Sequence, residues 1–226
     1  SHMEGTMADI PQVTTLVIRD GRRPKNPLPF YSAFPGRGSQ GSVDFHLLIE
    51  TGSTEAAALC QRALGSLQTS LTGGGRTSLT TMLQEAFQAC HEELEAANAP
   101  SDLASRVGVG VTCLALRGDE SYLAVVGDAV MYLRDQHGVS KITPAIQGTS
   151  SPVLGTSQDP IEVTMARPAL KDGESLLVAS GSLEDAVGYD GIENILSTSP
   201  EAAIEKLTLL MGDDPLFLAI ILNTKD

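Results

Sequence analysis

Two glycine-rich segments and four histidines are the residues of this chain whose types could bind a cofactor, an anion or a metal ion. Residues 36–41 read GRGSQG and satisfy the dinucleotide-binding pattern G-x-G-x-x-G. That site requires a strand before the pattern and a helix after it, so that a pyrophosphate meets the helix N-terminus. Here a strand pattern, VDFHLLIE at residues 43–50, follows instead. We therefore interpret this segment, with Pro35 before it (residues 35–41), as a turn.

The second glycine-rich segment, GGGRTS at residues 73–78, opens a predicted helix and could hold an anion through its backbone N–H groups. It lacks the lysine and the spacing of a P-loop, so a helix–helix linker is the default interpretation. The histidines at positions 2, 46, 91 and 137 do not stand at zinc-ligand spacing with a cysteine or with one another. No G-x-S-x-G segment supports a serine hydrolase.

The elements that must position any site are predicted from hydrophobic periodicity. Alternating or continuous apolar runs predict strands, and apolar residues three and four apart predict helices. Ser78 begins the second helix, Ser53 or Thr54 caps the first, and Ser199 caps the last one ahead of Pro200. The strand patterns after residue 106 are joined by short turns, which is typical of an antiparallel meander. Strands are predicted at residues 13–18, 30–34, 43–50, 107–116, 122–126, 130–134, 139–142, 161–166, 175–179 and 216–222, and helices at 54–71, 78–98, 183–187 and 200–211.

Composition excludes several function classes. The net charge of −13 repels phosphate backbones and anionic lipid, which argues against nucleic-acid binding and against membrane binding. No apolar run approaches the ~20 residues that span a bilayer, so we expect a cytoplasmic domain without membrane insertion. Three widely spaced cysteines indicate buried, reduced thiols. We interpret residues 1–3 as a tag remnant and residues 8–226 as a single domain.

Several segments, in a meaningful order, carry a resemblance to a known family. They are GVGVTCLA at residues 108–115, YLAVVGDAV at 122–130, Leu-Gly at 154–155, LVASGSL at 177–183 and DDPL at 213–216. Taken with RGSQGS at 37–42 and LLIETG at 47–52, this order resembles the PPM-type (type 2C) metal-dependent serine/threonine protein phosphatases. The resemblance implies an α+β fold, a four-layer α-β-β-α sandwich of two mainly antiparallel sheets flanked by helices.

The same resemblance implies that the metal-ligand carboxylates are largely replaced. In the family two Mg²⁺ or Mn²⁺ ions are bridged by acidic side chains. Carried onto this chain, two of the four carboxylate positions become Ser42 and Gly181, while Glu50 and Asp214 remain as metal-ligand remnants. Two carboxylates cannot offset the dehydration of two divalent ions, so we expect no stable two-metal centre and no cofactor. Arg37 stands where some members place a phosphate-binding arginine; the alternative is an ordinary surface residue.

Three functions remain open at this point. The first is a pseudophosphatase, a regulatory module that binds a protein partner or a phosphoprotein. The second is a weakly active metal-dependent phosphatase in which Glu50 and Asp214 hold one Mg²⁺ or Mn²⁺ ion, assisted by Asp44 or Asp213. The third is a scaffold without a ligand. Asp128, in the Gly-Asp pair after a strand pattern, is interpreted as a turn residue and not as a metal ligand.

Overall fold

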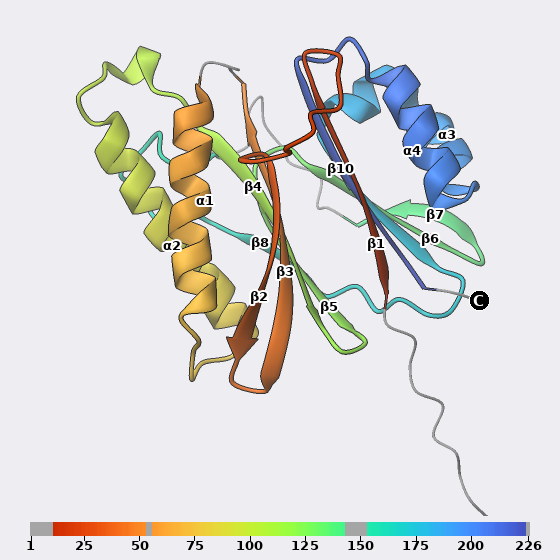
Figure 1. The fold of residues 1–226 in the computed structure, drawn as a ribbon, viewed down its shortest axis with the longest axis horizontal. Helices are drawn as coiled ribbons and strands as arrows, with labels where there is room; N and C mark the ends of the chain where they lie inside the picture. Colours follow the sequence, from red (N-terminus) through yellow and green to blue (C-terminus); the bar gives the residue numbers. More distant parts are fainter. Residues whose placement is uncertain (1–10, 53–55, 143–152, 225–226) are drawn as a thin grey trace, which may run out of the picture.

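A computed structural model describes residues 11–52, 56–142 and 153–224, and within them two antiparallel sheets pack between two pairs of helices (Figure 1). The predicted four-layer α-β-β-α sandwich is therefore confirmed. Sheet I contains, in spatial order, β1 (Gln12–Arg19), β10 (Leu216–Asn223), β9 (Ser175–Ala179), β6 (Val130–Asp135) and β7 (Gly138–Lys141). Sheet II contains β2 (Tyr31–Gly38), β3 (Gly41–Thr51), β4 (Val109–Arg117), β5 (Glu120–Val126) and β8 (Thr164–Ala166).

The helices cover the outer faces of the sheets (Figure 1). Helices α1 (Ala57–Thr72) and α2 (Leu79–Asn98) lie on sheet II, and α3 (Ser182–Leu196) and α4 (Pro200–Leu210) lie on sheet I. A short 3₁₀ segment, η2 (Leu103–Ser105), follows α2. One apolar core joins α1, α2 and sheet II to the inner face of sheet I, and a second joins sheet I to α3 and α4.

Helix starts follow the capping residues that the sequence indicates. The Ser78 hydroxyl accepts a hydrogen bond from the Thr81 backbone N–H at 3.3 Å, and the Ser199 hydroxyl accepts one from the Ala202 N–H at 3.2 Å. Each satisfies one of the N–H groups that the first turn of a helix leaves without a partner. The cap expected at residue 53 or 54 lies outside the described residues, as does the tag remnant at residues 1–3. The domain boundaries stay a prediction.

Two local predictions are wrong. Residues 35–38 continue β2 and pair with β3, so the turn predicted over 35–41 shrinks to its last residues. The strands after residue 106 also do not form one meander, because β6 leaves sheet II and pairs with β9 of sheet I. Hydrophobic periodicity marks a strand as buried but does not say which of two stacked sheets receives it. Helix α3 is longer than predicted and kinks at Gly188, whose φ is 65°.

Strand β3 sets the geometry that matters for function: it lies between β2 and β4 in sheet II and joins the two ends of that sheet (Figure 1). Phe45 lies against α1, since a Cβ on Gly36 would meet both the Phe45 ring and the Leu71 carbonyl. Side chains alternate along a strand, so even-numbered residues of β3 face sheet I. Glu50 therefore ends β3 on its inner face. Among the described residues no helix is long and apolar enough to cross a membrane.

Candidate functional site

Three carboxylates from separate elements meet at the C-terminal end of β3. Glu50 is the next-to-last residue of that strand, Asp128 lies in the connection from β5 to β6, and Asp214 lies just before β10. The charges of Asp128 and Asp214 both act on Glu50, and the Ser180 hydroxyl hydrogen-bonds to it. We call Glu50, Asp128 and Asp214 the acidic cluster. The structure thus brings together the predicted Glu50 and Asp214, and adds an aspartate that the sequence had indicated only as a turn residue.

Glu50 differs from an ordinary surface glutamate. Burial of its carboxyl group raises its pKa to about 8, and the nearby charge of Asp128 acts in the same direction. The hydrogen bond with Ser180 opposes this shift, and the charge of Asp214 adds to it. At neutral pH the Glu50 side chain is therefore mainly protonated. It can donate a hydrogen bond there, as a carboxylate cannot.

Asp214 already has a strong partner within the chain. The Ser182 hydroxyl donates a hydrogen bond of 2.6 Å to its Oδ2 atom. The Pro215 carbonyl accepts a hydrogen bond from the Asp20 N–H at 2.9 Å, which ties the end of β1 to the start of β10. Asp214 is thus held by its own loop and by the β9–α3 connection.

Glycines let the backbones around the cluster approach closely. A Cβ placed on Gly181 would lie 2.6 Å from the Asp128 carbonyl oxygen and 3.0 Å from its Oδ2. Gly127 has a φ of +126°, which L side chains rarely adopt, and a Cβ there would lie 3.1 Å from the Gly110 Cα. The resemblance expects a carboxylate where this chain has Gly181. In this backbone any side chain at 181 would displace Asp128.

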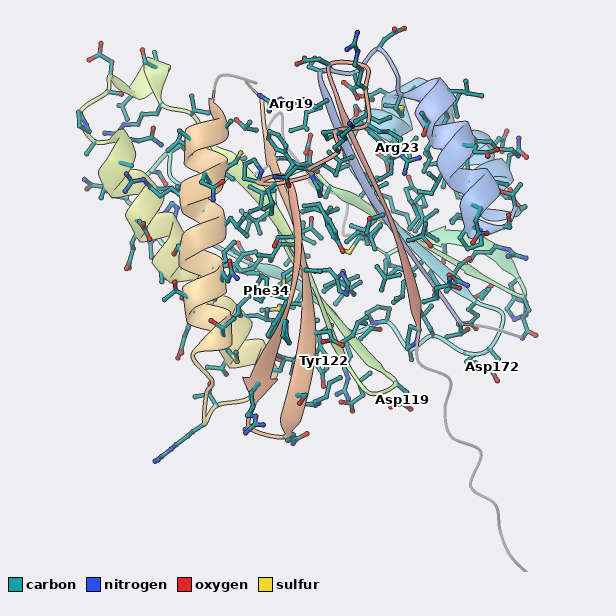
Figure 2. All side chains as sticks on the ribbon, in the orientation of Figure 1. Arg19, Arg23, Phe34, Asp119, Tyr122 and Asp172 are labelled. Carbon is teal, nitrogen blue, oxygen red and sulfur yellow. The ribbon has the colours of Figure 1, made fainter. Side chains whose placement is uncertain are left out.

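An arginine that sequence reasoning missed lies at the same end of the molecule. The Arg19 guanidinium stacks on the Phe30 ring at 5.1 Å from its centroid. The charges of Arg19 and Glu50 both act on the Cys60 thiol, although burial is the main reason that its pKa is raised to about 11. Figure 2 shows Arg19 at the upper end of the two sheets. Nothing in the sequence indicates this position, because Arg19 is brought here by the pairing of β1 with β10, which sets it opposite Leu216, two residues after Asp214.

The structure separates two other predicted residues from this cluster. Arg37 pairs with Ser42 near the β2–β3 turn, at the opposite end of β3 from Glu50. Glu50 follows Ser42 by eight positions along the strand, or about 26 Å at ~3.3 Å per residue. The assignment of Ser42 as a lost ligand beside Glu50 is therefore wrong, because the β2–β3 register turns at Gly38 and Gly41. Phosphate binding by exposed Arg37 stays a prediction, but not at this cluster.

The assisting aspartates also fall in different places. Asp44 lies on β3 opposite Leu116, six residues and about 20 Å from Glu50 at ~3.3 Å per residue. It cannot share a metal ion with Glu50. Asp213 is exposed beside Asp214. The two carboxylates whose charges act on Glu50 are Asp128 and Asp214.

A divalent metal ion would need several oxygen ligands at about 2.0–2.6 Å. Within residues 11–52, 56–142 and 153–224, no three histidine, cysteine, aspartate or glutamate side chains are placed so that they could hold a metal ion. Asp214 is engaged by Ser182, and Gly181 contributes no side chain. The described donor set therefore does not fit a two-ion centre.

Comparison with known proteins gives the fold a name. No family model matches the chain, and no curated protein matches it in sequence. Among solved structures, the serine/threonine phosphatase of S. agalactiae superposes with a TM-score of 0.71 at 13% identity, covering 95% of this chain and 100% of that one. The PPM Ser-Thr phosphatase MsPP from Mycobacterium smegmatis, in complex with cacodylate, gives 0.66 at 14% identity, covering 96% and 100%. The chain has the fold of the PPM-type serine/threonine phosphatases.

A further neighbour bears on the metal question. The catalytic domain of the serine/threonine protein phosphatase PstP, solved in complex with two manganese ions, superposes with a TM-score of 0.67 at 17% identity, covering 96% of this chain and 99% of that one. At such identities the likeness shows the fold alone. What this chain does must therefore be argued from its own residues, and these differ from a two-metal site in the way described above.

Proposed function

We propose that this PPM-fold chain is a pseudophosphatase, a regulatory domain that binds a protein or phosphoprotein and does not hydrolyse phosphate esters through a two-metal centre. The observation that carries the proposal is the position of Gly181. The family resemblance expects a carboxylate ligand there, and here the backbone approaches Asp128 so closely that no side chain fits without displacement. In this proposal the fold is retained, and position 181 serves close backbone packing in place of a ligand side chain.

The surroundings of Asp214 support the same proposal. Its Oδ2 accepts a 2.6 Å hydrogen bond from Ser182, which occupies one acceptor site of the carboxylate and fixes its orientation. Mg²⁺ in particular gives up its waters reluctantly and demands near-ideal octahedral geometry. A cluster that lacks one ligand side chain and holds another in an internal hydrogen bond is poorly suited to offset that cost.

A phosphatase assay on a phosphoserine peptide with added Mn²⁺ tests the proposal. We expect no metal-dependent turnover above that of the Asp214→Ala variant. An active phosphatase of the same fold, assayed in the same buffer, controls for substrate and metal. Robust turnover with Mn²⁺ that disappears in Asp214→Ala would overturn the proposal.

A second candidate function is a weakly active metal-dependent phosphatase with a reduced, one-ion site. The specific observation in its favour is that the charges of Asp128 and Asp214 both act on Glu50, so that three carboxylates lie near one another, although a bound ion would require their side chains to move closer together. If an ion bound, these side chains would hold it, and its chemistry would be to activate a water molecule.

Calorimetric titration with Mn²⁺ separates the two functions. Micromolar binding that is lost in both Asp214→Ala and Asp128→Asn supports the one-ion enzyme. The absence of binding heat supports the pseudophosphatase. Asp172→Asn, a change in an exposed turn elsewhere, is the matched control, because it removes the same charge without touching the cluster.

A further inference from the structure

A polar pocket lies at the end of the sandwich opposite the acidic cluster. It is bounded by the β2–β3 turn, the N-terminus of α2 and the β4–β5 hairpin, and its volume is about 320 Å³. The side chains that matter for binding are two arginines, one tyrosine and the hydroxyl groups of the β2–β3 turn and the first turn of α2. The side chains described in this way are Arg117, Arg167, Tyr122, Ser39, Ser78 and Thr80. We call this cavity the arginine pocket.

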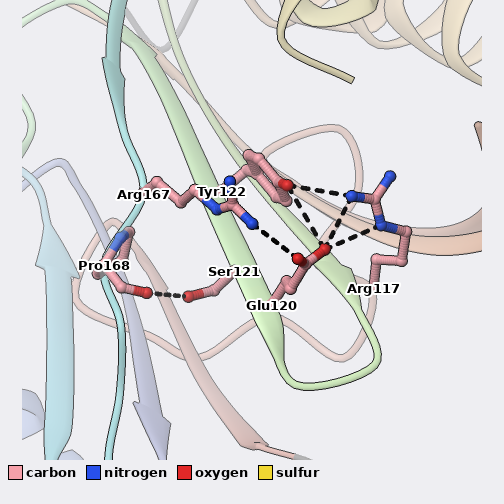
Figure 3. Close-up of polar contacts among 6 residues, drawn as sticks. All are labelled: Arg117, Glu120, Ser121, Tyr122, Arg167 and Pro168. Atoms are coloured by element: carbon pink, nitrogen blue, oxygen red, sulfur yellow. Dashed lines mark hydrogen bonds and ion pairs between the residues drawn. The ribbon is translucent and has the colours of Figure 1, made fainter. Parts of the chain in front are cut away.

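The two arginines are held in place by a single glutamate. Arg117 donates to Glu120 Oε2 from Nε at 3.1 Å and from Nη2 at 2.8 Å, and Arg167 donates from Nη2 to Oε1 at 2.7 Å. Figure 3 shows the two guanidinium groups approaching Glu120 from opposite sides, with Tyr122 between them. Their carbons lie 5.6 Å (Arg117) and 4.8 Å (Arg167) from the Tyr122 ring centroid. Groups fixed in this way lose little further freedom when a ligand binds.

Glu120 does not accept hydrogen bonds from all the N–H donors of Arg117 and Arg167. Among the described residues, Nε and Nη1 of Arg167 have no hydrogen-bond partner, and 59% of that side chain is exposed. An arginine has five N–H donors in a fixed fork, which matches the oxygens of a phosphate group. The pocket therefore presents preorganised, unused cationic donors to solvent.

The charge around the pocket contrasts with that of the whole chain. The chain carries a net −13, yet the pocket itself is lined by two arginines against the one carboxylate of Glu120. Exposed Arg37 lies on the adjoining hairpin, and the loop that carries exposed Arg76 leads directly into Ser78. Asp119 lies at the tip of the β4–β5 hairpin and does not line the pocket (Figure 2).

The start of α2 adds a weaker contribution of the same sign. This helix has 20 residues, and Ser78 caps it by accepting from Thr81 N–H. The remaining N–H groups of a first helical turn carry partial positive charge and favour anions. Leu79 and Thr80, in that turn, line the pocket beside the arginines. Two guanidinium groups, hydroxyl donors and a helix N-terminus thus surround one cavity.

We propose that the arginine pocket binds the phosphate monoester of a phosphorylated peptide. Bidentate guanidinium contact suits a phosphate dianion, and a pocket of this size takes a phosphoserine side chain together with part of its backbone. The choice of a phosphoprotein as the source of the phosphate rests on the proposed function. Anion binding itself does not depend on whether the acidic cluster turns over a substrate, so the two proposals can fail separately.

The test is a titration of the ¹⁵N-labelled full chain, followed by amide chemical shifts, with three probes. These are a phosphoserine peptide, its unphosphorylated form and inorganic phosphate. We expect the phosphopeptide and phosphate to shift the amides of Ser39, Thr80 and Tyr122, and the unphosphorylated peptide to leave them unchanged. Tighter binding of the phosphopeptide than of phosphate identifies a phosphoprotein ligand. Equal binding of the two contradicts that choice of ligand.

The decisive variant is Arg167→Gln, because this exposed side chain can be changed with little effect on folding. We expect it to weaken phosphopeptide binding roughly tenfold, the effect of losing one charge-assisted contact. Arg62→Gln on α1 is the matched control, since Arg62 is 53% exposed and pairs with Glu93 at 3.9 Å. The proposal is overturned if no probe binds at millimolar concentration, or if both variants weaken binding equally.

Discussion

The two ends of the sandwich each hold a glutamate, and the two glutamates are perturbed in opposite directions. At the acidic cluster, burial raises the pKa of Glu50 to about 8, and the negative charges of Asp128 and Asp214 add to the shift. At the arginine pocket, hydrogen bonds from Arg117 lower the pKa of Glu120, and Arg167 adds its charge. The same side chain is thus mainly neutral at one end and ionised at the other. The difference shows that burial and nearby carboxylates raise the pKa of Glu50 at one end of the fold, while at the other end two arginines face the one carboxylate of Glu120.

That contrast has a consequence for function. A phosphate-processing site needs positive charge where the phosphate binds, supplied by metal ions or by arginines. The acidic cluster supplies it only if metal ions bind, and its donor set does not fit two ions. The arginine pocket supplies it from the chain itself. The proposed phosphopeptide site and the acidic cluster therefore lie at opposite ends of the fold.

The largest expected effect concerns the close approach at Gly181. Gly181→Ala should lower the free energy of unfolding by about 3 kcal/mol, because the new methyl group would lie 2.6 Å from the Asp128 carbonyl oxygen and force the backbones apart. Urea denaturation measures the change. Gly65→Ala is the control, since a Cβ at this helical position meets no atom within 4 Å and should raise stability by up to ~1 kcal/mol.

A Gly181→Ala variant with unchanged stability would contradict the comparison between the two ends of the molecule. It would mean that the β9–α3 connection can withdraw from Asp128 at no cost. A carboxylate at position 181 would then be tolerated as well, and the absence of a ligand there could not be attributed to packing.

The next effect is the pH dependence that Glu50 imposes. Its pKa is raised from 4.5 to about 8 on folding, so its contribution to stability is complete below about pH 4.5 and is lost as the pH rises through about 8. Glu50→Gln removes this loss. Between pH 4.5 and 8.5 the stability of the variant relative to the wild type should therefore increase by about 2 kcal/mol, allowing for partial solvent screening.

Chemical denaturation at several pH values measures that difference directly. Asp172→Asn serves as a control for the general loss of a negative charge and should follow the wild-type curve. Parallel curves for wild type and Glu50→Gln would show that Glu50 titrates normally and that the acidic cluster is open to solvent.

How much of this could be read from the sequence differs between the two ends. Glu50 and Asp214 were predicted as neighbours from the family resemblance, and the strands that carry them were found from periodicity. Asp128 was indicated only as a turn residue, because a Gly-Asp pair after a strand is usually a simple turn. Its role depends on β6 crossing to sheet I, and a hydrophobic pattern contains no information on which sheet a strand joins.

The arginine pocket was not predictable in this way. Arg117, Glu120 and Arg167 come from β4, β5 and the segment after β8, and 50 positions separate the first from the last. Arg117 and Glu120 are near in sequence across a hairpin turn, which could have indicated a local ion pair. Arg167 joins them only because β8 pairs with β5 along Leu123–Val125. Long-range strand pairing of this kind has no signature in one sequence.

A smaller effect tests whether the arginines at the pocket are equivalent. Arg117→Ala should cost about 1.5 kcal/mol of stability, because only 15% of its side chain is exposed and it contacts both Glu120 and the Tyr122 hydroxyl. Arg167→Ala should cost about 0.5 kcal/mol, as expected of an exposed ion pair. Thermal or urea unfolding ranks the two. Equal costs would contradict the division into one structural arginine and one that is free to bind.

A final effect, similar in size to the previous one, concerns the acidic cluster. Ser182→Ala removes the 2.6 Å hydrogen bond to Asp214 and should lower stability by about 1 kcal/mol, the usual net value of one hydrogen bond with a partly exposed acceptor. Ser197→Ala on α3, which loses a bond from a hydroxyl to the Glu193 carbonyl on the exposed side, is a suitable control. The variant also bears on the metal question, because it frees Asp214 Oδ2. If Ser182→Ala gains Mn²⁺ binding in the calorimetric titration, the hydrogen bond is what keeps the ion out. If it does not, the missing side chain at Gly181 is the stronger obstacle, as the geometry around Asp128 leads us to expect.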